Sequence, residues 1–223
     1  MRKIHKGPEP ESLRLHRERQ PTTEEADPPC YGNYTQLDDA RAAARLEQRE
    51  ICAFCQATIA RKKAGMRLAH IIPRSDPNDG ARLQLVWTNI VGSCRGGERT
   101  KEPKDYHCDK RQGPIPLHQA LDPVHLLPGA LTFDATAAIL AADGNPDVQD
   151  QLDDVLGLNL EHIKERRRRA WQDTRGEISA EQDPAKKRAQ LLETLDSANI
   201  RIEPLLEYSD YLLHCLRQWS PGS

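Results

Sequence analysis

Four cysteines in one stretch of the chain constrain its fold more than any other feature. Cys52 and Cys55 form a C-x-x-C pair, and Cys94 and Cys108 follow as a second, more widely spaced pair. A C-x-x-C turn directs two thiolates at one ion, and a distant second pair completes a tetrahedron. Thiols must lose their protons to bind a metal ion, so metal binding and local folding are coupled. The pattern therefore predicts a structural zinc site within residues 51–116.

Length and composition describe a polar protein that depends on such a cross-link. The 223 residues fit one large domain or two small ones. Aromatic residues make up only 4% of the chain and charged residues 30%, so a metal ion would add rigidity that few aromatic side chains supply. The formal net charge is −2, so any contact with nucleic acid has to come from local basic patches.

The sequence lacks the features of a membrane or secreted protein. No run of about eighteen apolar residues is present, so we expect no membrane span. The first residues, MRKIHKGPEPES, have no apolar core and do not resemble a secretory signal, so we expect a cytoplasmic location. Disulfides are rare in that compartment, and clustered cysteines there indicate metal ligands first.

Hydrophobic spacing predicts helices over most of the chain and a strand within the cysteine-rich segment. Residues 66–72 alternate as a strand does, up to Pro73. Helices are predicted over 31–50, 148–169 with a break at Gly157, 179–198 and 204–219. Residues 130–142 suit either a hairpin or a helix. We predict three regions: an N-terminal extension and helix at 1–50, a zinc-bound module at 51–116, and a mostly helical C-terminal region at 117–223.

Several short motifs follow one another in the cysteine-rich segment. They are Cys52-x-x-Cys55, Ala69-His70-Ile71-x-Pro73, Asn89-Ile90-Val91, Cys94 and His107-Cys108-Asp109. Together they resemble the HNH endonuclease family, in which a ββα-metal motif sits on a four-cysteine zinc. The wider chain is similar to one branch of it, the HNH subunit of Septu-type anti-phage defence (PtuB), which also occurs beside some retrons.

The resemblance implies a fold, an activity and a partner. The implied fold is α+β, with a ββα-metal HNH module on a structural zinc and a mostly helical C-terminal region. The implied activity is hydrolysis of phosphodiester bonds with a catalytic Mg²⁺ or Mn²⁺, under the control of a partner ATPase (PtuA-like). HNH modules cut DNA most often, so DNA is the expected substrate, with transfer RNA or another RNA as alternatives.

The resemblance also implies a role for individual residues. His70 matches the general base at the end of the first strand, and its ordinary pKa of about 6.5 suits proton uptake near neutral pH. Asn89 matches the residue that holds the loop and orients this histidine. Asp109 stands where many family members have the final histidine, and it is the candidate ligand of the catalytic metal. A carboxylate oxygen suits Mg²⁺ or Mn²⁺. His107 is the second candidate for that ligand, and the four cysteines match the structural zinc.

Ala69 departs from the family pattern. An acidic residue or a histidine usually precedes the base as a second ligand of the catalytic metal, and alanine cannot coordinate an ion. One possibility is that Asp109, His107 and substrate phosphates hold the catalytic ion. The alternative is a catalytically impaired zinc-binding adaptor that binds nucleic acid or a partner.

Basic residues around the expected strand are candidate contacts for nucleic-acid phosphates. These residues are Arg61, Lys62, Lys63, Arg67 and Arg74. A second basic run, KERRRR at 164–169, is typical of a solvated helix face, and it also suits contact with phosphates or docking to a partner.

Overall fold

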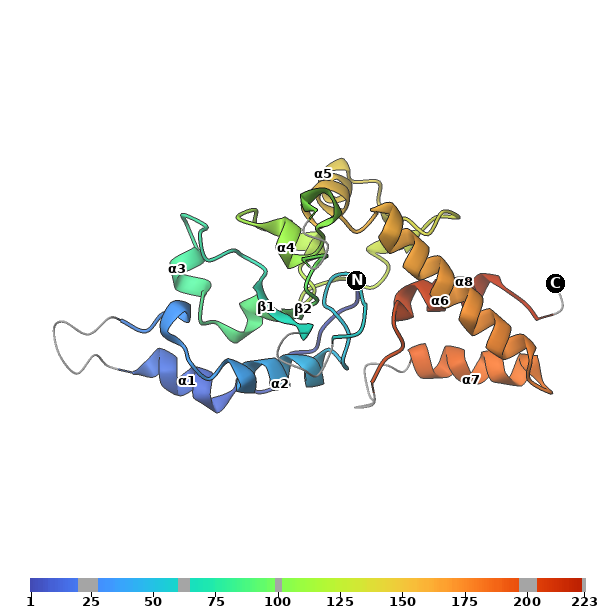
Figure 1. Ribbon diagram of the computed structural model, residues 1–223, viewed down its shortest axis with the longest axis horizontal. Coiled ribbons are helices and arrows are strands. Elements are labelled where there is room, and N and C mark those ends of the chain that lie inside the picture. Colours follow the sequence, from blue (N-terminus) through green and yellow to red (C-terminus); the bar gives the residue numbers. More distant parts are fainter. Residues whose placement is uncertain (20–27, 60–64, 99–101, 197–203, 222–223) are drawn as a thin grey trace.

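Two small antiparallel sheets and a set of α-helices form a mixed α and β structure in the computed structural model (Figure 1). The structure describes residues 1–19, 28–59, 65–98, 102–196 and 204–221. The mixed class agrees with the α+β prediction. None of the described helices combines the length and the apolar character that a membrane crossing requires.

The first sheet lies in the cysteine-rich segment. Strand β1 (Arg67–His70) pairs antiparallel with β2 (Ile90–Ser93), and His70 lies opposite Ile90 at the end of the pairing. The short helix α4 (Asp109–Gln112) packs against β1, where Gln112 Nε2 donates to the carbonyl oxygens of His70 at 3.3 Å and Ile71 at 3.1 Å. Helix α4 thus follows the two paired strands along the chain and lies beside the strand that ends in His70.

The N-terminal helices run along one side of this sheet (Figure 1). They are α1 (Glu11–Glu18) and α2 (Leu37–Glu47), and the short α3 (Gly80–Leu83) lies between β1 and β2 in sequence. The buried face of α2 presents Ala40 and Ala44, one turn apart, and these small side chains let the helix contact both strands closely. Asp38 and Asp39 occupy its first turn, where carboxylates interact favourably with the helix dipole.

The segment from 130 to 158 supplies the second sheet and a helical turn. Strands β3 (Leu131–Phe133) and β4 (Ile139–Ala141) form an antiparallel hairpin, so of the two structures open for 130–142 the hairpin is found. Helix α5 (Pro146–Asp150) continues into a π-helical turn at Gln151–Val155. The chain then breaks at Gly157, as predicted, where φ is +60° and an added Cβ would lie 2.7 Å from Arg111 Cδ.

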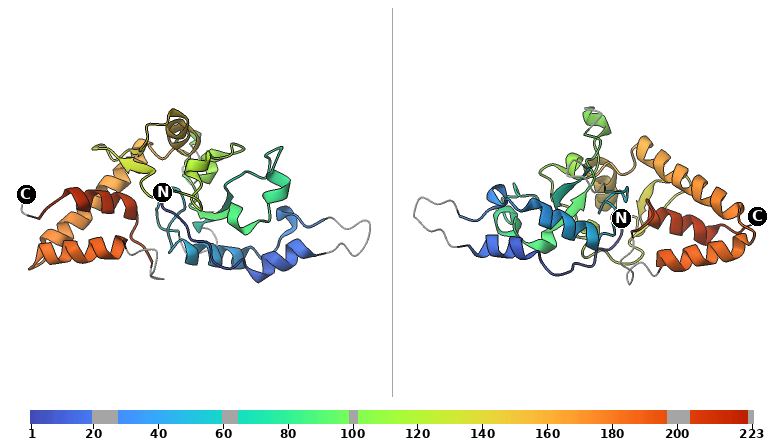
Figure 2. Two further views of the ribbon diagram at one scale, coloured as in Figure 1. Left: turned by 180° about the vertical axis from the view of Figure 1, so that it is seen from behind. Right: turned by 60° about the horizontal axis from the view of Figure 1, so that its bottom comes forward.

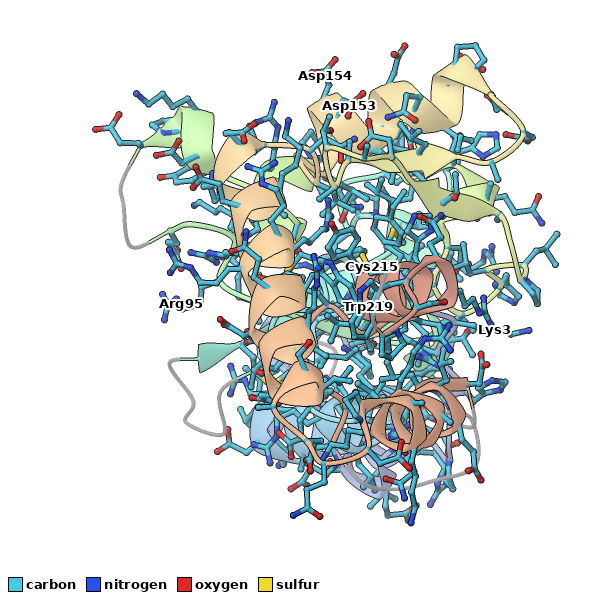
Figure 3. All side chains as sticks on the ribbon, turned by 90° about the vertical axis from the view of Figure 1, so that its right-hand side faces the viewer. Lys3, Arg95, Asp153, Asp154, Cys215 and Trp219 are labelled. Atoms are coloured by element: carbon cyan, nitrogen blue, oxygen red, sulfur yellow. The ribbon has the colours of Figure 1, made fainter. Side chains whose placement is uncertain are left out.

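Three longer helices form the C-terminal part (Figures 1 and 2). They are α6 (Glu161–Ser179), α7 (Pro184–Asp196) and α8 (Ser209–Gln218). Their facing sides bury Ile178, Leu195, Leu212 and Leu216. Figure 3 shows Cys215 of α8, and Trp219 directly after this helix, next to α6. The Trp219 ring meets the ring of Trp171 in α6 edge to face, with the ring centroids 5.6 Å apart.

The main hydrophobic core draws on all three predicted regions. Fully buried side chains in it include Leu13, Phe54, Ile90, Leu121 and Leu156. The helices α6 to α8 pack around the separate cluster described above. The N-terminal helices and the hairpin thus share one core with the cysteine-rich segment, and this core fixes the surroundings of His70.

Candidate metal centre and histidine site

Three chain segments bring the four cysteines together. Cys52 and Cys55 lie on a turn between α2 and β1, Cys94 directly follows β2, and Cys108 directly precedes α4. The Sγ atoms of Cys52 and Cys108 are 3.9 Å apart, those of Cys55 and Cys94 are 3.7 Å apart, and those of Cys94 and Cys108 are 3.8 Å apart. A zinc tetrahedron with bonds of about 2.3 Å has sulfurs about 3.8 Å apart. The four thiols can therefore bind a structural metal ion such as zinc, as the sequence predicts.

Backbone groups support negative charge on these sulfurs. The Cys94 N–H donates to Cys52 Sγ at 3.3 Å, and the Gly96 N–H donates to Cys94 Sγ at 3.4 Å. Hydrogen bonds to the charged form favour that form. Gly96 has a φ of +57°, and an added Cβ would lie 2.1 Å from the His107 carbonyl oxygen, so a side chain there would separate the two halves of the cluster.

The thiols also influence one another's ionisation. Burial raises the pKa of Cys108 well above its ordinary value. Burial also opposes ionisation of Cys52, but hydrogen bonds with Cys108, Cys55 and Cys94 outweigh it, and the pKa of Cys52 lies well below its ordinary value. The thiols of Cys52 and Cys108 therefore do not ionise independently of each other. A divalent cation among them would favour the thiolate form of all four.

A buried cation accompanies the cluster. Arg167 of α6 is only 3% exposed, and its Nη1 donates to the Ala137 carbonyl oxygen at 2.9 Å. Burial lowers the pKa of Arg167, whereas the nearby Cys55 and Cys108 act in the opposite direction. A zinc ion with four thiolates carries two negative charges, which a buried guanidinium offsets in part. The position of Arg167 therefore fits a charged metal centre better than neutral thiols.

His70 lies at the end of β1 with a defined tautomer. Its Nε2 lies 3.0 Å from the Gln84 carbonyl oxygen, which can only accept, so Nε2 carries the proton. In the neutral ring, Nδ1 then has a lone pair that can accept a proton. The ring is 7% exposed and meets Tyr31 edge to face at 4.6 Å. Burial lowers the pKa of His70 to about 4, so the imidazole is neutral at physiological pH. It is therefore a weaker base than the ordinary pKa of about 6.5 predicts.

Asn89 holds the loop that follows His70. It ends the 3-10 turn Trp87–Asn89, and its side chain is buried. Its Oδ1 accepts from the Ile72 N–H at 2.8 Å, and its Nδ2 donates to the carbonyl oxygens of Ile72 at 3.0 Å and Leu83 at 3.2 Å. These bonds tie the segment after His70 to the segment that leads to Gln84, whose carbonyl holds the imidazole.

Asp109 is the first residue of α4 and forms an ion pair with Arg67. Its Oδ2 lies 2.7 Å from Arg67 Nε. Burial raises the pKa of Asp109, and the charge of Arg67 acts against this shift. The carboxylate is thus held as one half of an ion pair, and it would have to exchange Arg67 for a cation to act as a metal ligand.

Tyr31 connects these groups, although no motif singles it out. Its ring contacts His70 and also lies 4.9 Å below the Arg74 guanidinium. Burial raises the pKa of Tyr31, with Arg74 and Asp109 as charged neighbours. The structure thus places His70 and Arg74 against one aromatic ring. The sequence offers only an isolated tyrosine after Cys30, and no spacing rule connects it with residues forty positions away.

His107 lies at the thiol cluster. Its Nε2 is 3.6 Å from Cys94 Sγ, its Nδ1 is 3.2 Å from the Asp105 carbonyl oxygen, and its ring packs 5.3 Å from that of His162. In the described part of the chain, the four cysteines are the one group of three or more His, Cys, Asp or Glu side chains that could share an ion. A catalytic ion held by His107 and Asp109 therefore stays a prediction.

The remaining predicted positions fall into three environments. Ala69 is 0% exposed and belongs to the main core, so its side chain points away from solvent. Arg67 and Arg74 are on or near β1, and Arg74 is exposed. Arg61, Lys62 and Lys63 lie outside the described residues.

No protein-family model matches this sequence, and no curated protein matches it. The geometry of the thiol cluster and of the His70 surroundings is therefore the structural basis for a functional conclusion, together with the motif resemblance.

Proposed function

We propose that this protein is an HNH-type nuclease effector of an anti-phage defence system, which hydrolyses phosphodiester bonds of nucleic acid. The supporting observation is the state of His70, whose Nε2–H donates to the Gln84 carbonyl and whose Nδ1 has no hydrogen-bond partner among the described residues, so its lone pair can accept a proton. A general base needs such a lone pair, held in a fixed direction. The exposed Arg74 packs on the same Tyr31 ring that contacts His70, and it adds a positive charge that a phosphodiester substrate would meet.

In this mechanism the chain's own groups position water and phosphate. His70 Nδ1 accepts a proton from a water molecule, and the water oxygen attacks the phosphorus in line with the leaving oxygen. The P–O bond to the leaving oxygen breaks, and that oxygen takes a proton from solvent. Arg74 would contact a phosphate oxygen. A bound Mg²⁺ or Mn²⁺ would supply charge stabilisation at the phosphoryl group and the leaving oxygen. Asp109 is the side chain that would hold it, and one carboxylate suffices where phosphates and waters complete the shell.

DNA is the favoured substrate, and an ATPase subunit is the proposed controlling partner. Both follow from the motif resemblance. The C-terminal helices α6 to α8 form their own packing cluster beside the main core, which makes them the proposed docking part.

A plasmid-nicking assay with Mn²⁺ tests the activity, with and without the ATPase and with an RNA substrate in parallel. The variant His70→Ala should cut at least about 100-fold more slowly than the native chain, because it loses the general base. The variant His5→Ala changes an exposed histidine and should cut at the native rate. Circular dichroism and zinc content confirm that both variants fold. Equal rates for the native chain and His70→Ala would refute the proposal.

A second function is favoured by a separate observation. Ala69 is sealed in the core and Asp109 is paired with Arg67, so few groups are available to a catalytic ion. A zinc-binding adaptor that binds nucleic acid without cutting it fits these two facts. Binding with no cleavage in Mg²⁺, Mn²⁺ or Zn²⁺, with the ATPase present, would distinguish the adaptor from the nuclease.

A further inference from the structure

Three cations converge on the carboxylate of Glu98. Arg95 donates from Nε at 2.9 Å and from Nη2 at 2.6 Å to Glu98 Oε2. Arg67 Nη1 lies 3.3 Å from Glu98 Oε1, and Lys110 Nζ lies 3.9 Å from the same oxygen. The three cations come from β1, from the turn after β2, and from α4. A single partly exposed carboxylate thus occupies the meeting point of three separate elements.

The thiol cluster fixes the spacing of these cations. Arg95 directly follows Cys94, and Lys110 lies two residues after Cys108. Between Arg95 and Glu98, Gly96 and Gly97 have φ values of +57° and +77°. Added Cβ atoms at these positions would lie 2.1 Å from the His107 carbonyl oxygen and 2.6 Å from the Asp105 carbonyl oxygen. The turn can therefore lie against residues 105–107 only with glycines there, and this contact holds Arg95 beside α4.

Arg67 links this cluster to the histidine site. One edge of its guanidinium meets Glu98 through Nη1, while its Nε lies 2.7 Å from Asp109 Oδ2. An anion in the place of the Glu98 carboxylate would therefore contact the same Arg67 guanidinium that pairs with Asp109. Figure 3 shows Arg95 at the outer surface of the molecule, so a ligand can reach the cluster from solvent.

The geometry suits a phosphate as well as a carboxylate. Guanidinium groups bind both anions through the same forked arrangement of N–H donors. Partly exposed ion pairs contribute little to stability, so an incoming anion can replace Glu98 at small cost. A nucleic-acid backbone also gains by releasing counterions, which a side-chain carboxylate does not.

We propose that Arg67, Arg95 and Lys110 form a binding site for a backbone phosphate of nucleic acid, and that Glu98 occupies this site until the phosphate replaces it. In the context of the proposed nuclease, the phosphate belongs to the strand that lies across Asp109 and His70. The site makes Glu98 a built-in competitor of the substrate, so its removal strengthens binding while removal of a cation weakens it.

The test measures binding in the absence of cutting. Fluorescence anisotropy with a labelled DNA duplex, and with an RNA of the same sequence, is performed on the His70→Ala chain without added divalent ions. The further change Glu98→Gln should lower Kd about 3- to 10-fold, as expected for loss of one competing ion-pair partner. Arg95→Gln should raise Kd and reduce the salt dependence of log K by about one phosphate contact.

A matched control separates this site from a general charge effect. Glu181→Gln removes the same charge from an exposed glutamate that pairs with Lys187 at 3.0 Å, far along the chain. It should change Kd by less than about 2-fold, as expected for a distant screened charge. Equal effects of Glu98→Gln and Glu181→Gln, or an unchanged salt dependence in Arg95→Gln, would overturn the proposal.

The outcomes also separate this site from the nuclease proposal. Stronger binding by Glu98→Gln with no cleavage by the native chain supports the phosphate site and the adaptor function. Cleavage that depends on His70, together with unchanged binding in Glu98→Gln, leaves the nuclease in place and removes the phosphate site.

Discussion

The thiol cluster and the histidine site are both linked to the short helix α4, but they differ in how complete they are. The cluster has four donors at tetrahedral spacing, with backbone N–H groups directed at two of the sulfurs. The histidine site has one oriented imidazole and one carboxylate, and the carboxylate already pairs with Arg67. The first site needs only an ion, whereas the second, under the proposed nuclease function, would need an ion, a substrate and the exchange of an ion pair.

The histidine site depends on the thiol cluster through the helix α4. Cys108 immediately precedes Asp109, and Gln112 of the same helix bonds the carbonyl of His70. A metal ion at the cysteines would therefore position both groups of the histidine site. The cluster stabilises the fold, and the histidine site depends on the cluster for its geometry.

The largest effect is expected at Ala69, the position that separates this chain from the family pattern. Neighbouring strand residues point to opposite faces, and Ala69 is 0% exposed, so Ala69→Asp places a carboxylate in the core. We expect the free energy of unfolding to fall by about 3–5 kcal/mol, with no gain in cleavage. Urea unfolding measures the loss, and Ala42→Asp on the exposed face of α2 serves as the control. A stable Ala69→Asp chain that gains Mn²⁺-dependent cleavage would show that this position faces the catalytic ion.

The second effect is the acid sensitivity of the histidine site. The folded pKa of His70 is about 4, below its unfolded value of about 6.5, because burial disfavours the charged ring. Between these two values the unfolded chain binds the additional proton. Stability from neutral His70 is therefore fully present above about pH 6.5 and is lost as the pH falls toward 4, by up to about 3 kcal/mol.

Urea unfolding near pH 7 and near pH 4.5 measures this loss in the native chain and in His70→Gln. The glutamine variant retains a donor for the Gln84 carbonyl and does not titrate. Both chains lose any bound metal ion alike in acid, so their difference isolates the histidine. Parallel pH profiles for the two chains would mean that His70 is not held neutral by burial.

The smallest effect concerns the buried cation beside the thiol cluster. Replacing Arg167 by methionine keeps a side chain of similar length. It removes the positive charge that would offset the negative charge of a zinc ion with four thiolates. We expect zinc affinity to fall about 10- to 100-fold, as for other groups that surround metal ligands. Competition with a chelating dye measures it. Arg167→Lys should lower the zinc affinity less. Arg169 is exposed on the same helix, and Arg169→Met should not change the affinity. Equal affinities for Arg167→Met and Arg169→Met would assign Arg167 a packing role only.

Local patterns predicted the parts of this structure that local rules determine. The C-x-x-C spacing identified the thiol cluster, alternation identified the strand that becomes β1, and Gly157 was recognised as a helix break. The sequence does not decide between a hairpin and a helix for residues 130–142, because their apolar residues suit both structures. The hairpin wins through contacts with residues elsewhere in the chain: the Asn159 side chain bonds both the N–H and the carbonyl of Ile139.

Local sequence patterns do not predict contacts between residues that are distant in the sequence. The ion pair of Arg67 with Asp109 joins residues whose relation depends on the packing of α4 against β1. Within KERRRR the four arginines are chemically equivalent, yet only Arg167 is buried. One signal was present, because Arg167 lies four residues after the buried Ile163 and so on the same face of α6.

The most direct test of this account is the metal content of the purified chain, measured by elemental mass spectrometry beside thermal unfolding. We expect about one zinc ion per chain, bound by four cysteines as in other structural sites. Cys108→Ser should lose the ion and the cooperative unfolding transition, whereas Cys30→Ser, whose thiol lies outside the cluster, should keep both. A native chain that folds without metal, or a Cys108→Ser chain that retains a full equivalent of zinc, would contradict the claim that the thiol cluster organises this fold.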